Sequence, residues 1–181
     1  LLKDTQQAYI YFGAPLNVDN LQKESALIKV ASFVLGGSGF GSRMLEEVRV
    51  KRGLAYSAVM RLNATHTQAS AQGYLQTSLK NEKEAQSLVQ QVVEEFVEKG
   101  ITSKELQEAK DYLLGSEPLR NETLSQRLGT AFTYYYNGLP LDFNKQVLEE
   151  ISKLTLKEVN DYIQSHQEIK NLSFAIVSAE N

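Results

Sequence analysis

The chain has 181 residues, of which 42% are hydrophobic and 23% charged, enough apolar material for the core of one domain over residues 1–181. Its formal net charge of −3 at pH 7 argues against a nucleic-acid partner, because domains that bind phosphates are usually basic. Cysteine is absent, which excludes disulfides and thiolate metal sites, and no apolar run approaches the ~20 residues of a membrane-spanning helix.

The first half of the chain predicts three strands and two helices. In chain order these are a strand over 7–12, helices over 19–35 and 43–52, and strands over 55–63 and 68–78. Ser42 is the expected N-cap of the short helix, and Gly53 lies just past its end. Residues 65–67 connect the last two strands, so we expect an antiparallel hairpin. Because the chain starts at Leu1 and its first strand follows at once, we also expect it to begin inside a longer protein.

The second half is predominantly helical. An apolar stripe predicts a long helix from its expected cap at Asn81, with Glu84 three residues on, to Gly100. The remaining expected elements are helices over 104–114, 123–136, 142–152 and 155–166 and a strand over 172–177. Two reciprocal caps between a threonine and a glutamate three residues later are expected at Thr102/Glu105 and Thr155/Glu158.

Grouped rather than alternating strands and helices favour an α+β fold, with an antiparallel sheet of about four strands packed against several helices. Of the three consecutive tyrosines at 134–136, we expect two in the core and one facing water. His66 and His166 are expected at the surface. Neither histidine lies in a zinc-binding His-x-x-Glu-His or His-Glu-x-x-His pattern, so no metal site is expected within this segment.

The strongest functional signal is a glycine-rich segment followed by a short helix and a strand. Its spacing fits neither the phosphate-binding P-loop nor the dinucleotide fingerprint, and a flexible connection between helices is the simplest structural interpretation. Seven positions separate Arg49 from Tyr56, and both side chains can donate a hydrogen bond to a carbonyl oxygen. Their structural alternatives are a cation at a helix end and a tyrosine in a strand.

Residues 35–44, LGGSGFGSRM, and residues 47–57, EVRVKRGLAYS, resemble the C-terminal half of the pitrilysin-like, inverted-motif zinc peptidases. Mitochondrial processing peptidase and insulin-degrading enzyme belong to this group. The resemblance continues at the helix starts near Thr102 and Thr155 and so covers nearly the whole chain. It implies a domain that pairs with a related N-terminal half, which carries the zinc ligands and the general base.

The resemblance also implies site residues. Arg49 and Tyr56 are the expected catalytic pair, adding hydrogen-bond donors at the carbonyl that zinc polarises. The expected substrate-binding residues are Gly36, Gly37, Gly39, Gly41, Ser42 and Arg43.

Three functional hypotheses follow. The first is the C-terminal domain of a zinc metalloendopeptidase, inert alone, with zinc in the N-terminal half and a peptide as substrate. The second is a non-catalytic partner subunit that completes the site of a separate zinc-bearing chain, and a dimer is compatible with either. The third is a purely structural or peptide-binding domain.

Overall fold

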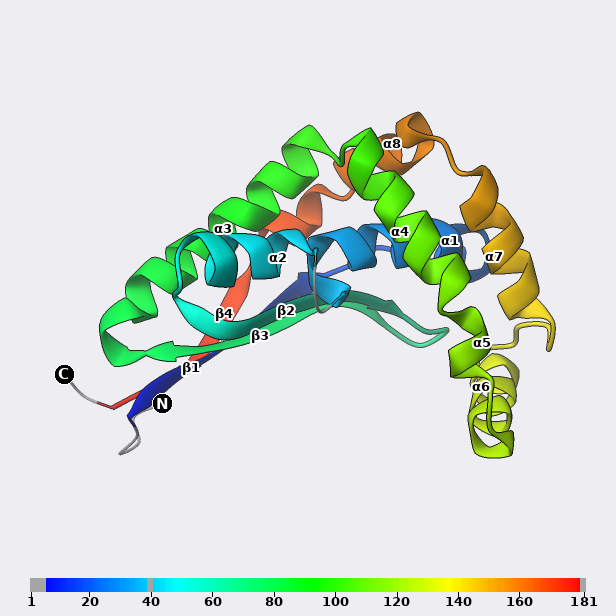
Figure 1. Cartoon of the computed structure of the whole chain (residues 1–181), viewed down its shortest axis with the longest axis horizontal. Coiled ribbons are helices and arrows are strands. Elements are labelled where there is room, and N and C mark those ends of the chain that lie inside the picture. Colours follow the sequence, from blue (N-terminus) through cyan, green and yellow to red (C-terminus); the bar gives the residue numbers. More distant parts are fainter. Residues whose placement is uncertain (1–5, 39–40, 180–181) are drawn as a thin grey trace.

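The computed structural model describes residues 6–38 and 41–179. Within these ranges, four strands form one antiparallel sheet in the order β2-β3-β1-β4, and helices pack against one of its faces (Figure 1). The strands are β1 (Gln7–Pro15), β2 (Ala55–Ala64), β3 (Ala69–Ser78) and β4 (Ser173–Val177). This architecture confirms the expected α+β fold and the antiparallel hairpin of β2 and β3.

Eight α-helices and four shorter helical turns connect the strands in the described part of the chain. The helices are α1 (Leu21–Ser32), α2 (Arg43–Leu45), α3 (Glu82–Lys99), α4 (Ser103–Gly115), α5 (Glu117–Arg120), α6 (Leu124–Tyr136), α7 (Phe143–Lys153) and α8 (Leu156–Ser165). The turns are the π-helical η1 (Phe33–Gly37) and η2 (Glu46–Lys51) and the 3₁₀ turns η3 (Leu79–Asn81) and η4 (Gln167–Lys170). The helix expected over 19–35 therefore ends in a π turn. None of the described helices combines the length and apolar character needed to cross a membrane.

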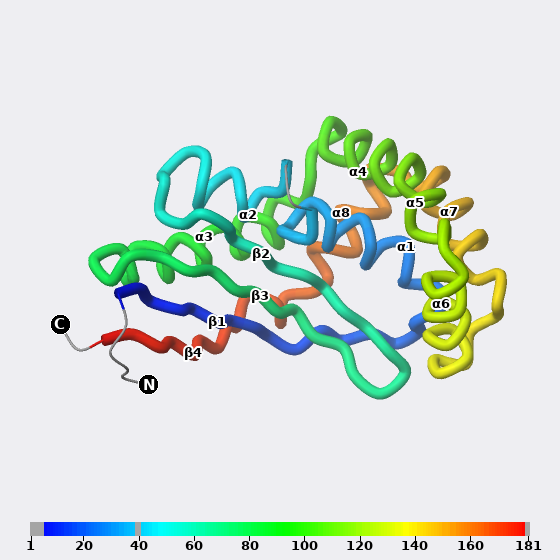
Figure 2. Tube along the Cα trace, turned by 60° about the horizontal axis from the view of Figure 1, so that its bottom comes forward, coloured from blue at the N-terminus to red at the C-terminus, as the bar shows by residue number. Residues whose placement is uncertain are grey.

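The sheet joins the two ends of the chain. β1 pairs with β3 along its whole length and with β4 on its other side, so the first and last strands lie side by side (Figure 2). Alternate β1 side chains, such as Ile10 and Phe12, are buried, whereas Tyr11 is 53% exposed on the opposite face. Because helices cover only one face, the other face of the sheet is left open.

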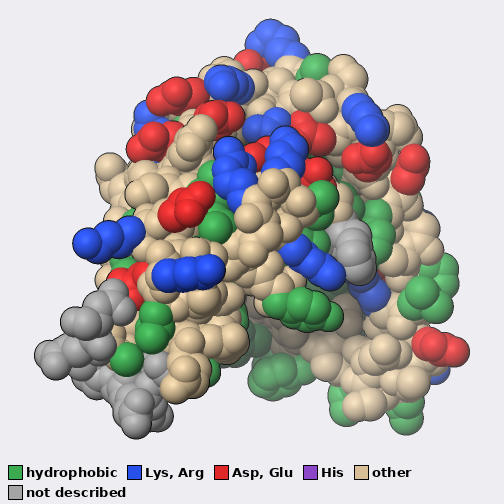
Figure 3. All heavy atoms as spheres, turned by 60° about the vertical axis from the view of Figure 1, so that its left-hand side comes forward, with side chains coloured by type: hydrophobic (Ala, Val, Ile, Leu, Met, Phe, Trp, Pro, Cys, Tyr) green, Lys and Arg blue, Asp and Glu red, His purple; other side chains and the backbone are tan. Residues whose placement is uncertain are grey.

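The core lies between the sheet and the helices. Every residue of the apolar stripe expected on α3 is buried, namely Ala85, Leu88, Val89, Val92, Val93, Phe96 and Val97. A view of the end that holds both termini shows charged side chains of both signs interspersed over its helical upper half. Several hydrophobic side chains lie exposed in its lower half (Figure 3).

Helix caps follow the sequence with one exception. The reciprocal caps at Thr102/Glu105 and Thr155/Glu158 are confirmed, and a third, not anticipated, joins Thr123 to Gln126. The expected cap at Asn81 is wrong. The preceding 3₁₀ turn holds Asn81 at φ −99° and ψ 0°, outside the extended conformation from which a side chain caps a helix, and its side chain makes no cap hydrogen bond.

Two expectations about exposure also need correction. Tyr134 packs against Phe143, but Tyr135 and Tyr136 are 81% and 52% exposed. The His66 ring, from the turn between β2 and β3, lies edge-on to Tyr136 at 4.6 Å between centroids but leaves most of that side of α6 uncovered. His66 is exposed as expected, whereas His166 is only 7% exposed. His166 continues the buried face of α8 four residues after Tyr162, whose ring it contacts at 4.3 Å between centroids.

Candidate functional site

The glycine-rich segment leads into a compact turn that joins η2 to β2. Ser42 caps α2 by accepting a hydrogen bond from the backbone of Leu45, as the sequence predicts. Gly53 has a φ of 61°, a left-handed conformation that favours glycine just past a helix. The amide of Leu54 then donates to the carbonyl of Val48 at 2.9 Å. The closed turn brings the end of η2 beside the start of β2.

Arg49 and Tyr56 meet across this turn. The Cζ atom of the Arg49 guanidinium lies 4.8 Å from the centroid of the Tyr56 ring, within the range of a cation–π contact. The Tyr56 side chain is nevertheless 82% exposed, so one side of it remains open to a ligand. A register shift between Ala55 and Ala58 interrupts the pairing of β2 with β3 at this residue. The arrangement presents an aromatic ring and a phenolic hydroxyl to solvent, backed by a fixed cation.

Two glycines of the segment, Gly36 and Gly37, pack closely against neighbouring backbone. A Cβ atom on Gly36 would lie 2.5 Å from the backbone nitrogen of Met60, and one on Gly37 would lie 2.7 Å from the carbonyl oxygen of Ser32. Both positions therefore require glycine for backbone packing. Gly41 has a φ of 83° with open space around it, and Gly39 lies outside the described residues. Substrate binding by the glycines stays a prediction.

Ser42 and Arg43 are engaged within the domain. Ser42 is fully buried in its capping role. Arg43 donates to both carboxylate oxygens of Glu105, at 2.6 and 2.8 Å, and to the carbonyl of Gly100 at 2.7 Å. Burial alone would raise the pKa of Glu105, but hydrogen bonds from Arg43 and Thr102 lower it below its ordinary value. These contacts tie α2 to the turn between α3 and α4, and direct substrate binding by either residue stays a prediction.

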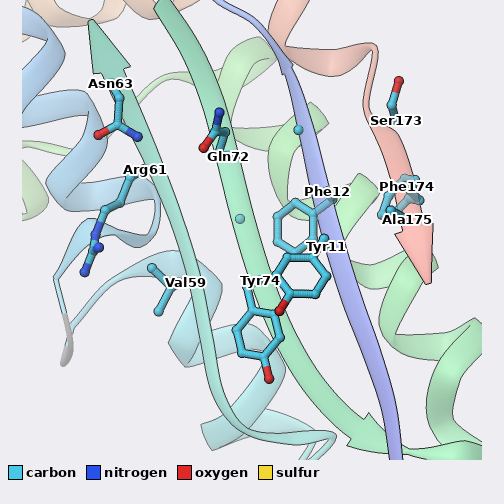
Figure 4. A pocket seen from close by; sticks show the side chains of 12 residues that line it. Tyr11, Phe12, Val59, Arg61, Asn63, Gln72, Tyr74, Ser173, Phe174 and Ala175 are labelled. Atoms are coloured by element: carbon cyan, nitrogen blue, oxygen red, sulfur yellow. The ribbon is translucent and has the colours of Figure 1, made fainter. Parts of the chain in front are cut away.

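A hollow of about 570 Å³ lies on the open face of the sheet (Figure 4). The rings of Tyr11 and Tyr74, from neighbouring strands, stand 4.8 Å apart between centroids within it. Gln72 and Asn63 add amide groups from β3 and β2. None of these four residues was predicted as a site residue from the sequence. The signal was the alternation of β1, in which Tyr11 falls between the apolar Ile10 and Phe12 and therefore on the opposite face.

Comparison with known proteins places the domain. The family model described as the peptidase M16 inactive domain matches residues 1–113. A Helicobacter pylori protein described as "Non-peptidase homolog YmxG" is 54% identical over 178 residues, which cover 98% of this chain and 41% of that protein. The chain belongs to the peptidase M16 inactive-domain family. The resemblance to the C-terminal half of pitrilysin-like peptidases is thereby confirmed.

Relatives of this M16 domain with lower sequence identity include proteins named as zinc proteases. "Uncharacterized zinc protease YmxG" of Bacillus subtilis is 28% identical over 161 residues, 87% of this chain and 38% of that protein. The crystal structure of a peptidase M16 inactive domain from Pseudomonas fluorescens superposes with a TM-score of 0.86 at 25% identity, covering 98% of this chain and 42% of that one. The chain thus spans about two fifths of the length of the relatives it matches.

Metal ligands do not gather in the described part of this M16 domain. No group of three or more His, Cys, Asp or Glu side chains there has the arrangement to hold an ion. His166 instead contacts Glu168 through Nδ1 at 2.8 Å, and Glu168 also accepts a hydrogen bond from the backbone of Asn17. A zinc ion in a longer protein would need ligands from outside these residues.

Proposed function

We propose that this chain is the non-catalytic C-terminal half of a longer M16 protein and that it binds extended polypeptide without cleaving it. The observation that carries the proposal is the Arg49–Tyr56 pair, in which the guanidinium Cζ lies 4.8 Å from the centroid of an exposed tyrosine ring. Aromatic rings with a polar tip give a large contact area at a low entropic cost. A guanidinium next to the ring further reduces the side-chain entropy that the tyrosine loses on binding. The tyrosines and amides of the open sheet face offer hydrogen bonds to a peptide backbone.

Two comparisons support binding over cleavage. The relative that shares 54% of its residues over nearly the whole chain is named a non-peptidase homolog. Relatives named as zinc proteases share 28%. The same Arg49–Tyr56 geometry would suit a peptidase, in which both groups would donate to the carbonyl oxygen under attack. That zinc metalloendopeptidase is the second candidate, and its metal would belong to the N-terminal half.

The N-terminal half of the longer protein is the proposed partner of this domain. Large apolar side chains are exposed on α6, with exposed fractions between 52% and 81%. They are Leu124, Leu128, Phe132, Tyr135 and Tyr136. Figure 1 shows α6 projecting past the open side of the sheet, at the end of the molecule away from the termini. An apolar face of this kind marks a contact surface in a soluble domain. The remaining three fifths of the relatives' length supplies a candidate to cover it.

Peptide binding by the longer protein tests the proposal. We expect unstructured fluorescein-labelled peptides of about ten residues to raise fluorescence anisotropy on binding, and Tyr56→Ala to weaken that binding about tenfold, because a buried aromatic contact contributes about 1–1.5 kcal/mol. Tyr56→Phe keeps the ring on Arg49 and removes only the hydroxyl, which separates stacking from hydrogen bonding. Val50→Ala is the control, since Val50 is 63% exposed on the same turn.

The same samples decide between the two candidates. Intact peptide after long incubation, measured by mass spectrometry, supports binding without cleavage. Cleavage that a chelator abolishes and that Arg49→Ala lowers would favour the metalloendopeptidase. Absence of any binding by the wild-type protein would overturn the proposal.

A further inference from the structure

A small hollow at the outer edge of the sheet is lined by three cations from three different elements. It has a volume of about 210 Å³ and lies between α1, β2, α4 and α5. Lys29 comes from α1, Arg61 from the edge strand β2 and Arg120 from α5. Like charges placed around one space repel each other, so this convergence is unexpected in a chain whose net charge is −3.

The three cationic side chains have no acidic partner among the described residues. None of them forms an ion pair there within 4 Å, although Arg120 lies over the ring of Tyr112. Glu117 is the acidic residue whose charge raises the pKa of Lys29. Its carboxylate accepts hydrogen bonds from Asn121 and Asn144, which fix it outside the hollow's lining. Positive charge in the hollow is therefore left without a bound counter-charge.

Lys29 is the most enclosed of the three. Burial lowers its pKa, the charge of Glu117 raises it, and the charge of Arg120 lowers it again, with a net decrease. The domain thus keeps an ammonium group in surroundings that disfavour its charge. An anion entering the hollow would attract the Lys29 ammonium, which offsets the cost of its burial, and would reduce the repulsion among the three cations.

The shape and walls of the hollow restrict the anion. The rings of Phe33 and Tyr112 stand 4.9 Å apart between centroids at its side, next to the buried Leu113. A volume of about 210 Å³ is below the range that encloses a whole small-molecule ligand, and suits a charged end group with one apolar side chain. A guanidinium fork matches a planar carboxylate in two parallel hydrogen bonds.

Arg61 connects this hollow with the open face of the sheet. It lines both spaces, and Figure 4 shows its side chain reaching from β2 away from β3, toward the edge of the sheet. A polypeptide lying across Tyr74 and Val59 would therefore find the cations at the margin of the face. The two spaces form neighbouring parts of one surface.

We propose that the hollow lined by Lys29, Arg61 and Arg120 is a binding site for the carboxylate of a polypeptide, with the adjacent apolar side chain against Phe33 and Tyr112. The source of that carboxylate is the C-terminus of the bound chain or an acidic side chain within it. This inference rests on the proposed function for the identity of the ligand, whereas the site itself follows from the cations alone.

Three peptides of one sequence distinguish the two sources in the longer protein. One ends in Phe with a free carboxylate, one ends in Phe amide, and one carries an internal Glu-Phe pair with an amidated end. We expect one of the two peptides that carry a carboxylate to bind at least fivefold more tightly than the Phe amide peptide. Raised salt should reduce this difference in affinity. A preference for the first identifies the C-terminus, and a preference for the third identifies the acidic side chain.

Neutral variants test the residues. Arg120→Gln and Lys29→Met should each remove most of the carboxylate preference and leave the affinity for the amide within twofold. Lys29→Met has a second use, since it removes a desolvated charge and should leave thermal stability unchanged or raised. Lys104→Gln, at a lysine 84% exposed on α4, is the matched control and should change nothing.

A small probe separates this proposal from the proposed function. N-acetyl-phenylalanine and its amide are titrated against the isotope-labelled protein, and we expect chemical-shift changes at residues of the hollow with the acid only. That result with no binding of longer peptides would keep the hollow and overturn the peptide-binding function. Equal binding of acid and amide, equal binding of inorganic phosphate, or full binding by both variants would overturn the carboxylate site.

Discussion

At the residue scale, close backbone contact explains the glycine-rich segment better than chain flexibility does. Gly36 packs onto the backbone of Met60 in β2, and Gly37 packs onto Ser32 at the end of α1. Arg43 and Glu105 then fix the following helix against the turn between α3 and α4. These contacts fix the backbone that leads into η2, on which Arg49 lies. Gly36 and Gly37 therefore have a structural role whether or not they also touch a ligand.

Alanine at Gly36 tests this role. We expect Gly36→Ala to lower the free energy of unfolding by about 1–3 kcal/mol, because the new Cβ would overlap backbone atoms that cannot rotate away. Urea unfolding followed by circular dichroism measures the change. Gly129→Ala on α6 is the control, since its Cβ would meet open space, and it should raise stability by about 0.5–1 kcal/mol. Equal effects at both positions would contradict the packing account.

The Arg43–Glu105 pair predicts a pH dependence of stability. The folded-state pKa of Glu105 lies below its ordinary value of 4.5, so its contribution is present above pH 4.5 and is lost as the pH falls through the folded pKa. We expect Glu105→Gln to lose less stability than the wild type between pH 7 and pH 3, measured by thermal unfolding. Glu108→Gln, at a glutamate 51% exposed on the same helix, should follow the wild-type curve. Parallel curves for the wild type and Glu105→Gln would contradict the assignment.

At the element scale, α6 differs from the other long helices because it has no buried residue. α3 and α8 use the same helical periodicity to bury an apolar face inside this domain, α3 against the sheet and α8 against α3 and α1, with Phe96 and Ile163 fully enclosed. On α6 the periodic side chains Leu128 and Phe132 remain 68% and 65% exposed. The exposed apolar face of α6 is therefore the surface that we assign to contact with the proposed N-terminal half.

Hydrogen exchange tests the covering of α6. In the longer protein we expect the backbone amides of α6 to be protected, and the double substitution Leu128→Ser with Phe132→Ser to raise their exchange at least tenfold while α3 stays unchanged. Lost apolar contacts would open the interface without affecting the sheet. Substituting exposed Lys157→Ser on α8 provides the control. Unprotected α6 amides in the wild-type protein would exclude a covering half.

At the scale of the whole molecule, one side of the sheet is filled by helices and the other carries a polar, aromatic surface. The open face and the cationic hollow meet at Arg61, which belongs to both. The Arg49–Tyr56 pair lies at the start of β2, the strand that also contains Arg61. This arrangement fits the proposed binding function, in which any cleavage would depend on groups that another half supplies.

Metal removal tests that division of roles. We expect peptide binding by the longer protein to persist in a chelator such as EDTA with less than a twofold loss of affinity, because the proposed contacts use only side chains of this domain. Zinc added back should then leave the affinity unchanged. A loss of binding that zinc restores would instead place a metal ion at the peptide site.

Local rules made much of the fold predictable. Strand alternation, the α3 stripe and two of the reciprocal caps follow from side chains within a few residues of each other, and the sequence contains them in full. The expected cap at Asn81 is wrong because the turn before it sets its backbone angles, which the cap pattern does not record. The sequence predicted two core tyrosines at 134–136 where the structure has one, because periodicity shows that a helix has an apolar face, and not whether this chain covers it.

The sequence by itself determined the α+β class, most element positions and the family, since each depends on short patterns or on a motif that reads continuously along the chain. Only the tertiary structure decided the strand order, the stacking of Tyr56 on Arg49 and the meeting of Lys29, Arg61 and Arg120. The physical reason is distance along the chain. Side chains on separate elements become neighbours only when the sheet and its helices pack, and no local pattern encodes that arrangement.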